Sequence, residues 1–79
     1  MYYCIFYLTE EASEENMDTL CDYFYSFSTF DSVVGANAGV LYVDLPTERT
    51  PPWDHVRDGE EEIIKLGFHI SKVVVEEEK

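Results

Sequence analysis

Hydrophobic side chains recur at every second position over residues 39–45, and this is the clearest periodic pattern in the chain. A two-residue period is typical of a β-strand, because successive side chains of a strand point to opposite faces of its sheet. Residues 2–8 alternate in the same way. The two segments predict strands whose inward-facing side chains are Cys4, Phe6, Leu8, Leu41, Val43 and Leu45.

Two other segments have the three- to four-residue hydrophobic spacing of an amphipathic helix. The first follows Ser13, a favourable N-cap, and has Glu14 and Glu15 in its first turn, where carboxylates interact well with the helix dipole. We expect its helical character to be lost within residues 26–29. The predicted buried stripe is Met17, Leu20, Cys21, Phe24 and Phe27.

The second helix is predicted from Pro52 to Leu66. Proline is tolerated in a first helical turn, and Gly67 supplies the C-cap. Gly59 has no side chain and would let the helix lie close to the sheet. The side chains predicted on the buried side are Trp53, Val56, Ile63 and Ile64.

Two further strands complete the predicted fold. Residues 31–34 form a short strand, and the loop at 35–39, with a glycine at each end, would turn the chain back into an antiparallel neighbour. The last strand is predicted over residues 69–75, and the acidic tail at 76–79 is expected to fray into solvent. Residues 1–79 are expected to form a single domain.

The predicted order of elements is strand, helix, strand, strand, helix, strand. With right-handed crossovers this order gives an α+β, ferredoxin-like βαββαβ fold, in which a four-stranded antiparallel sheet carries both helices on one face. The other face would be left bare, and an exposed apolar patch of this kind usually marks a contact surface. Its predicted members are Tyr3, Ile5, Tyr7, Val40, Tyr42, Ile70 and Val74.

The composition adds a strong charge imbalance to this picture. Seventeen acidic residues against five basic residues give a net charge of −12, which repels phosphate backbones and anionic lipid. We therefore expect no direct binding to nucleic acid or to a membrane, even though aromatic side chains on a sheet can stack with RNA bases. The charge favours a basic protein partner or a metal ion, and an acidic surface that serves solubility alone is the alternative interpretation.

Residue types that carry catalysis or bind metals are few and poorly placed. His55 and His69 have no Cys, Asp or Glu at a metal-ligand spacing, so we expect no metal and no cofactor. Cys4 and Cys21 both lie at apolar positions, as small buried hydrophobes of a reducing compartment do. A pair of Cys4 and His69 would lack a third orienting group, and the contiguous glutamates do not converge as an acid–base pair requires. With neither a leader nor an apolar run of membrane-spanning length, we expect a soluble, cytoplasmic protein that is not an enzyme.

The chain resembles small bacterial domains, frequent in planctomycete-like genomes, that precede a helix-turn-helix DNA-binding module. The segments that carry the resemblance are Leu20 in the first helix, residues 31–35, residues 39–45, and residues 66–73 with the acidic tail. The chain departs from the family pattern at Pro51, Pro52 and Trp53, and at Glu60, where these domains usually carry an apolar residue. The resemblance implies DNA-linked regulation. Because the sequence ends where the helix-turn-helix would begin, we expect this copy to have lost the DNA reader or to act through a partner that has one.

Two functional hypotheses remain open. In the first, the acidic helices bind a basic, nucleic-acid-binding protein, in the manner of antitoxins, anti-restriction or anti-CRISPR inhibitors that imitate the charge of DNA in bacteria or phages. Its expected contact residues are Asp18, Asp22, Glu61 and Glu62. In the second, the chain is an accessory dimerisation or sensing domain of a helix-turn-helix regulator and forms a homodimer through the open sheet face. Its expected contact residues are Tyr3, Tyr7 and Tyr42.

Overall fold

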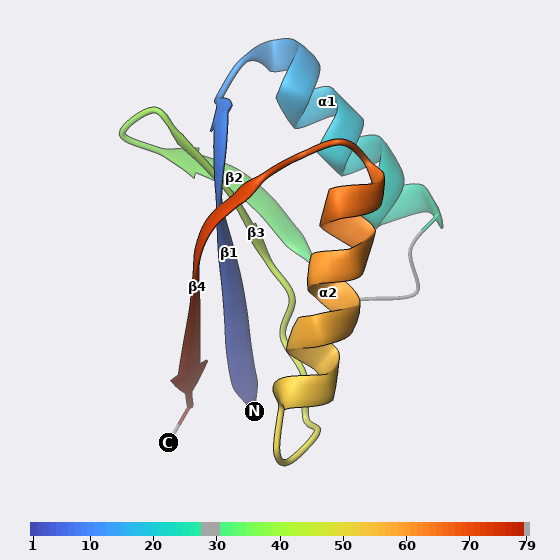
Figure 1. Ribbon diagram of the computed structural model, residues 1–79, viewed down its shortest axis with the longest axis vertical. Helices are drawn as coiled ribbons and strands as arrows, with labels where there is room; N and C mark the ends of the chain where they lie inside the picture. Colours follow the sequence, from blue (N-terminus) through green and yellow to red (C-terminus); the bar gives the residue numbers. More distant parts are fainter. Residues whose placement is uncertain (28–30, 79) are drawn as a thin grey trace.

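The computed structural model describes residues 1–27 and 31–78 (Figure 1). Its strands and helices follow the predicted order, and a π-helical turn continues the first helix. The elements are β1 (Tyr2–Glu11), α1 (Glu14–Asp22), the π-helical turn η1 (Tyr23–Phe27), β2 (Val33–Asn37), β3 (Val40–Asp44), α2 (Trp53–Lys65) and β4 (Ile70–Glu77).

The four strands form one antiparallel sheet in the order β2-β3-β1-β4. β1 and β3 are its central strands, while β2 and β4 are its edges. The predicted antiparallel pairing of the strand at 31–34 with the strand at 39–45 is confirmed as the pairing of β2 with β3. Both helices lie on the same side of the sheet (Figure 1), so the fold is α+β with a helical layer and a sheet layer.

The core lies between the helices and one face of the sheet. Every sheet side chain that was predicted to face inward is at most 3% exposed, and helical side chains such as Leu20 and Ile63 pack against this set. Gly59 lies directly against the sheet, because a Cβ atom there would come within 2.7 Å of Leu45 and 2.9 Å of Phe6. The predicted role of this glycine in close packing is confirmed.

The start of α1 is as predicted. Ser13 is the N-cap, and its Oγ accepts a hydrogen bond of 3.1 Å from the Asn16 N–H, with acidic residues in the first turn. Most of the predicted hydrophobic stripe belongs to the core or packs against it. Ser26 and Phe27 still belong to the π-helical turn, so the first two residues of the run 26–29 keep helical character. Residues 28–29 and the predicted burial of the Phe27 side chain lie outside the described part of the chain.

The bounds of α2 agree with the prediction, but the predicted buried side was wrong for two residues. Trp53 is 62% exposed and Ile64 is 61% exposed. Ile63 is buried and Val56 packs against the core, as predicted, and the remaining residues that face the core are Pro52, His55 and Gly59. A proline, a histidine and a glycine give no hydrophobic signal, so the buried stripe could not be recognised from hydrophobicity. Gly67 follows the C-cap residue Leu66 with a positive φ of 92°, as expected of a glycine that ends a helix.

The hairpin between β2 and β3 is tighter than predicted. Gly35, which was placed in the loop, lies within β2 opposite Tyr42, and the strand continues to Asn37. The turn consists of Ala38 and Gly39 alone, with positive φ values of 52° and 80°. Two successive residues with positive φ form the type of two-residue turn whose twist matches that of the flanking strands.

β4 is longer than predicted at its acidic end. Glu76 and Glu77 pair with Tyr3 and Tyr2, and the Glu78 N–H donates to the Met1 carbonyl at 2.9 Å. These residues of the tail are therefore paired rather than frayed. Ile70 was also assigned to the wrong face: a register shift between Tyr7 and Leu8 places it opposite buried Leu8, where it packs against the core.

Candidate interaction surfaces

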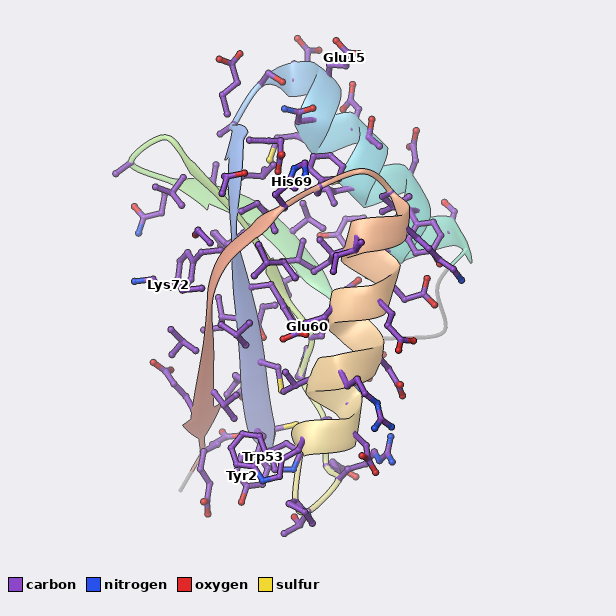
Figure 2. All side chains as sticks on the ribbon, viewed as in Figure 1. Tyr2, Glu15, Trp53, Glu60, His69 and Lys72 are labelled. Atoms are coloured by element: carbon purple, nitrogen blue, oxygen red, sulfur yellow. The ribbon has the colours of Figure 1, made fainter. Side chains whose placement is uncertain are left out.

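The acidic helical surface consists of the exposed carboxylates of α1 together with Glu61 and Glu62 of α2. The structure describes all four predicted members and adds two from the first turn of α1; the full set is Glu14, Glu15, Asp18, Asp22, Glu61 and Glu62. Glu15 marks the exposed end of this surface in Figure 2. The two added glutamates were visible in the sequence, but there they were interpreted only as helix-starting residues.

One hydrogen bond ties the two helices of this surface together. The Tyr23 hydroxyl, at the start of η1, donates to Glu62 Oε2 of α2. This hydrogen bond, followed by burial and by the charge of the carboxylate, raises the pKa of Tyr23. The phenol therefore stays protonated as a donor, and it holds Glu62 beside the π-helical turn.

The ion pairs that arginine forms among the described residues all lie at the start of α2. Arg57 lies 3.4 Å from Asp54, and Arg49 lies 3.6 Å from Asp54 and 4.0 Å from Asp58. None of the ion pairs found among the described residues includes a carboxylate of α1. The carboxylates of α1 and of the second half of α2 therefore have no ion-pair partner among the described residues, and neither have Glu76, Glu77 and Glu78 at and just after the end of β4.

The open sheet face is the side of the sheet opposite to the helices. The three predicted tyrosines lie on it, and all are half-buried rather than free in solvent. The Tyr7 and Tyr42 ring centroids are 6.3 Å apart, Lys72 Nζ lies 4.9 Å from the centre of the Tyr7 ring, and the Tyr3 hydroxyl donates to Glu78 at 3.0 Å. The lysine and the neighbouring Glu76 were not predicted as members, although their spacing from Val74 places them on this face.

Asp44 is the most unusual group on the open sheet face. It lines a hollow of about 390 Å³ together with Ile5, Tyr7, Ala36, Asn37 and Tyr42. Its Oδ1 atom is buried and accepts no hydrogen bond from the residues that the structure describes. Burial, and then repulsion from Glu76, raise the pKa of Asp44. A buried carboxylate without donors destabilises its own ionised form and favours a ligand or partner that brings a donor.

A second hollow, of about 610 Å³, lies between α2 and the start of β4. Its lining is Glu60, Ile64, Gly67, Phe68, His69 and Ile70. At its rim the His69 ring is held by Glu10, since Nδ1 lies 2.8 Å from Oε2 and the His69 N–H donates to Oε1 at 2.8 Å. Burial pushes the pKa of Glu10 upwards, but the hydrogen bonds from His69 outweigh this and leave it lowered.

Cys4 and His69 are not brought together. Cys4 is fully buried opposite Val75, whereas His69 pairs with Thr9 at the other end of β1. Burial, and then the charge of Asp44, raise the pKa of the Cys4 thiol, which opposes formation of a nucleophilic thiolate. His55 lies in the core, where burial chiefly lowers its pKa while a hydrogen bond with the Leu45 backbone opposes the shift.

Within residues 1–27 and 31–78, no three His, Cys, Asp or Glu side chains are placed to hold a metal ion together. In the same part of the chain no helix has the length and apolar character that crossing a membrane requires. Comparison of the chain with protein-family models, curated proteins and solved structures finds no match.

Proposed function

We propose that this chain is a non-catalytic protein-interaction module whose acidic helical surface binds a basic, nucleic-acid-binding protein and inhibits it by occupying the site of the nucleic acid. The observation that carries the proposal is the separation of charge described above. The arginines compensate carboxylates at the start of α2, while the α1 carboxylates have no ion-pair partner within the described residues. An uncompensated acidic surface on a rigid helical layer is what a phosphate-binding protein surface would attract.

The fold supports a binding module of this kind. The strand order β2-β3-β1-β4, with one helix in each of two crossovers, supports a ferredoxin-like arrangement. In such an arrangement the two helices form a continuous layer, and the hydrogen bond between Tyr23 and Glu62 fixes their carboxylates relative to one another. The free Cys4 and Cys21 thiols are in keeping with a cytoplasmic location, and the proposal is compatible with the resemblance to domains linked to DNA-binding regulators.

The test is a matched pair of double variants. Asp18→Asn with Asp22→Asn removes two uncompensated charges from α1, and we expect slower association with the partner and a flatter dependence on salt. Asp54→Asn with Asp58→Asn removes the same charge from carboxylates that arginines already compensate, and should leave binding nearly unchanged. Glu62 is kept in both, because it accepts the Tyr23 hydrogen bond.

The measurement is a pull-down from host lysate, identification of the retained protein, and a titration of its nucleic-acid binding with the wild-type chain and both variants. Displacement of nucleic acid by the wild type, and weaker displacement by the α1 variant alone, supports the proposal. Equal retention at about 1 M salt, where the Debye length is only about 3 Å, contradicts a charge-driven interaction.

The alternative function, an accessory dimerisation or sensing domain, is favoured by a different observation. The hollow beside Tyr42 holds the half-buried Asp44 carboxylate, whose Oδ1 atom is buried, and combines it with aromatic and apolar side chains, as small-molecule sites often do. In this case Tyr42→Ala, and not the α1 variant, should abolish binding or self-association through the open sheet face.

A further inference from the structure

The two edges of the sheet differ in whether an outward-facing backbone group accepts or donates a hydrogen bond to another part of the chain. On the β2 edge the Val34 N–H donates to the Tyr25 hydroxyl at 2.8 Å, so this N–H is not free to pair with another strand. β4 forms the other edge, and no described strand pairs with its outer side. In β4 the Glu78 N–H bonds to β1, and the alternation of an antiparallel ladder then directs the backbone groups of Val73 and Val75 away from β1.

We propose that two copies of this chain associate through these free edges, with the β4 strands antiparallel and centred on Val74, to form one continuous eight-stranded sheet. This assembly goes beyond the proposed binding of a basic partner and uses a different surface from the open sheet face. An unpaired edge that presents valines is a ready template for another strand. The inference rests on the self-complementarity of β4 and of the helix beside it.

The sequence of β4 matches its own reverse about Val74. In an antiparallel pair centred there, Lys72 lies directly opposite Glu76 of the second copy, and the reciprocal pair forms on the other side of the axis. Val74 faces its own counterpart between these two ion pairs. On the helical side, Val73 faces Val75 of the second copy, so charge meets opposite charge and valine meets valine.

Neighbouring registers lack this match. Centring on Val73 would place Lys72 opposite Val74 and Glu76 opposite Ile70. Centring on Val75 would place both Val73 and Val74 opposite glutamates. A parallel pairing would set the acidic ends of the two β4 strands side by side, whereas the antiparallel pairing sends them to opposite ends, which matters for a chain with a net charge of −12.

The helical layer has a matching pattern. Trp53, Arg57, Glu60 and Ile64 follow one another at helical spacing on α2, and Figure 2 shows Trp53 and Glu60 projecting from the helix on the side of β1 and β4. A two-fold axis would oppose Trp53 to Ile64 of the second copy and Arg57 to Glu60 of the second copy. This pairing accounts for the two exposed hydrophobic side chains of α2 that the isolated fold leaves unexplained.

The two centres of symmetry coincide along the strands. The midpoint between Trp53 and Ile64 on α2 falls next to Gly59, and Gly59 packs on Phe6. Phe6 is paired with Val73, which is adjacent to the proposed axis at Val74. The two β1 strands would lie about 14 Å apart, three strand spacings of about 4.8 Å each. Because a Cβ at Gly59 would meet Leu45 as well as Phe6, α2 lies over β1 and the end of β3, so the two helices face one another across at least this distance.

Charge reversal tests the register. We expect sedimentation of the full chain to show a dimer, and Lys72→Glu or Glu76→Lys to weaken it roughly tenfold or more, because each places like charges opposite one another twice. The double variant Lys72→Glu with Glu76→Lys restores the pairs and should recover the dimer. Lys65→Glu, which changes the net charge as Lys72→Glu does but lies at the end of α2, should leave the dimer intact.

A single cysteine tests the axis independently of charge. In a Cys21→Ser background, Val74→Cys would face its own counterpart at a Cα separation of about 4.5 Å, within the range of a disulfide. We expect rapid oxidation to a covalent dimer, slow oxidation of Val33→Cys on the β2 edge, and slow oxidation of Tyr42→Cys on the open sheet face. Circular dichroism confirms that each variant is folded.

Three results would overturn the proposal: a monomer at concentrations up to about 1 mM, a dimer that Lys72→Glu leaves unchanged, or cross-linking at Tyr42→Cys in preference to Val74→Cys. None of them bears on the affinity of the α1 carboxylates for a basic partner, so the dimer and the proposed function can fail separately.

Discussion

On the helical side of the sheet, Cys4, Phe6 and Leu8 are at most 3% exposed, whereas their neighbours Tyr3, Ile5 and Tyr7 on the open side are only half-buried. Both sets come from the same strand, and both are rich in large hydrophobic side chains. The open side differs in having charged groups between them, namely Asp44, Lys72 and Glu76. Hydrophobicity alone therefore does not determine which face of this sheet is the core; the covering helices do.

The largest difference between the faces is expected on truncation of adjacent aromatic residues. Phe6→Ala should lower the free energy of unfolding by about 3–5 kcal/mol, because it leaves a cavity in the closed core. Tyr7→Ala should cost clearly less, since solvent can fill the space beside it. Urea unfolding at one protein concentration measures both, and Phe6→Leu provides an intermediate value if Phe6→Ala does not fold. Equal losses at the two positions would contradict the distinction between the faces.

Two glycines give a smaller test. A Cβ at Gly59 would meet Leu45 and Phe6 inside the core, and Gly59→Ala should destabilise the fold by about 1–3 kcal/mol, even though alanine otherwise favours a helix by about 1 kcal/mol. A Cβ at Gly35 would meet the Tyr42 hydroxyl at 2.5 Å and the Tyr42 ring at 2.7 Å, but this side chain is half-buried on the open sheet face and we expect it to move aside. Gly35→Ala should therefore cost less than about 1 kcal/mol and change the near-ultraviolet dichroism of the tyrosines. A Gly59→Ala variant more stable than wild type would refute close packing of α2.

Two titratable groups, one on each side of the sheet, should change the free energy of unfolding in opposite directions as the pH falls. Burial lowers the pKa of His55 below its ordinary 6.5, so the unfolded chain takes up the proton first and His55 makes the fold less stable as the pH falls below about 6.5. Asp44 has the opposite effect on stability. Because its pKa is raised, the folded chain takes up the proton before the unfolded chain does, so this group stabilises the fold as the pH falls through the raised pKa towards 3.8.

The measurement is stability against pH for the wild type, His55→Gln and Asp44→Asn. In His55→Gln, stability should fall less steeply below pH 6.5 than it does in the wild type. His69→Gln is the control, because His69 is exposed. Asp44→Asn should be more stable than wild type at neutral pH, and its advantage should shrink on acidification. An unchanged slope in His55→Gln, or a less stable Asp44→Asn at pH 7, would show that burial does not govern these groups.

Much of the fold could be predicted because local chemistry determined it. The N-cap at Ser13, the positive φ at Gly67 and the alternation in β1 and β3 each depend on a few adjacent residues. The errors arose where distant contacts decide. The face of Ile70 depends on a register shift in a pairing with β1, and the orientation of α2 depends on Gly59 fitting against Phe6.

The candidate surfaces were predictable to a similar extent. Asp18, Asp22 and Glu61 are recognisable as helical carboxylates, but their isolation from the arginines depends on where residues 46–52 place Arg49. The missing hydrogen-bond donor at Asp44 Oδ1 and the hydrogen bond from the Val34 N–H to the Tyr25 hydroxyl both depend on the folded chain, so no sequence pattern could indicate them.

The Tyr25 hydroxyl on Val34 has a consequence for how far assembly can proceed. A sheet with two unpaired edges can add copies without limit and grow into a fibre, whereas a sheet with one such edge is complete after a single symmetric pairing. In the proposed dimer, the Tyr25 hydroxyl occupies the Val34 N–H and hinders the pairing of a further strand at the β2 edge. Tyr25→Phe would free this N–H, and we expect the variant to form assemblies larger than a dimer.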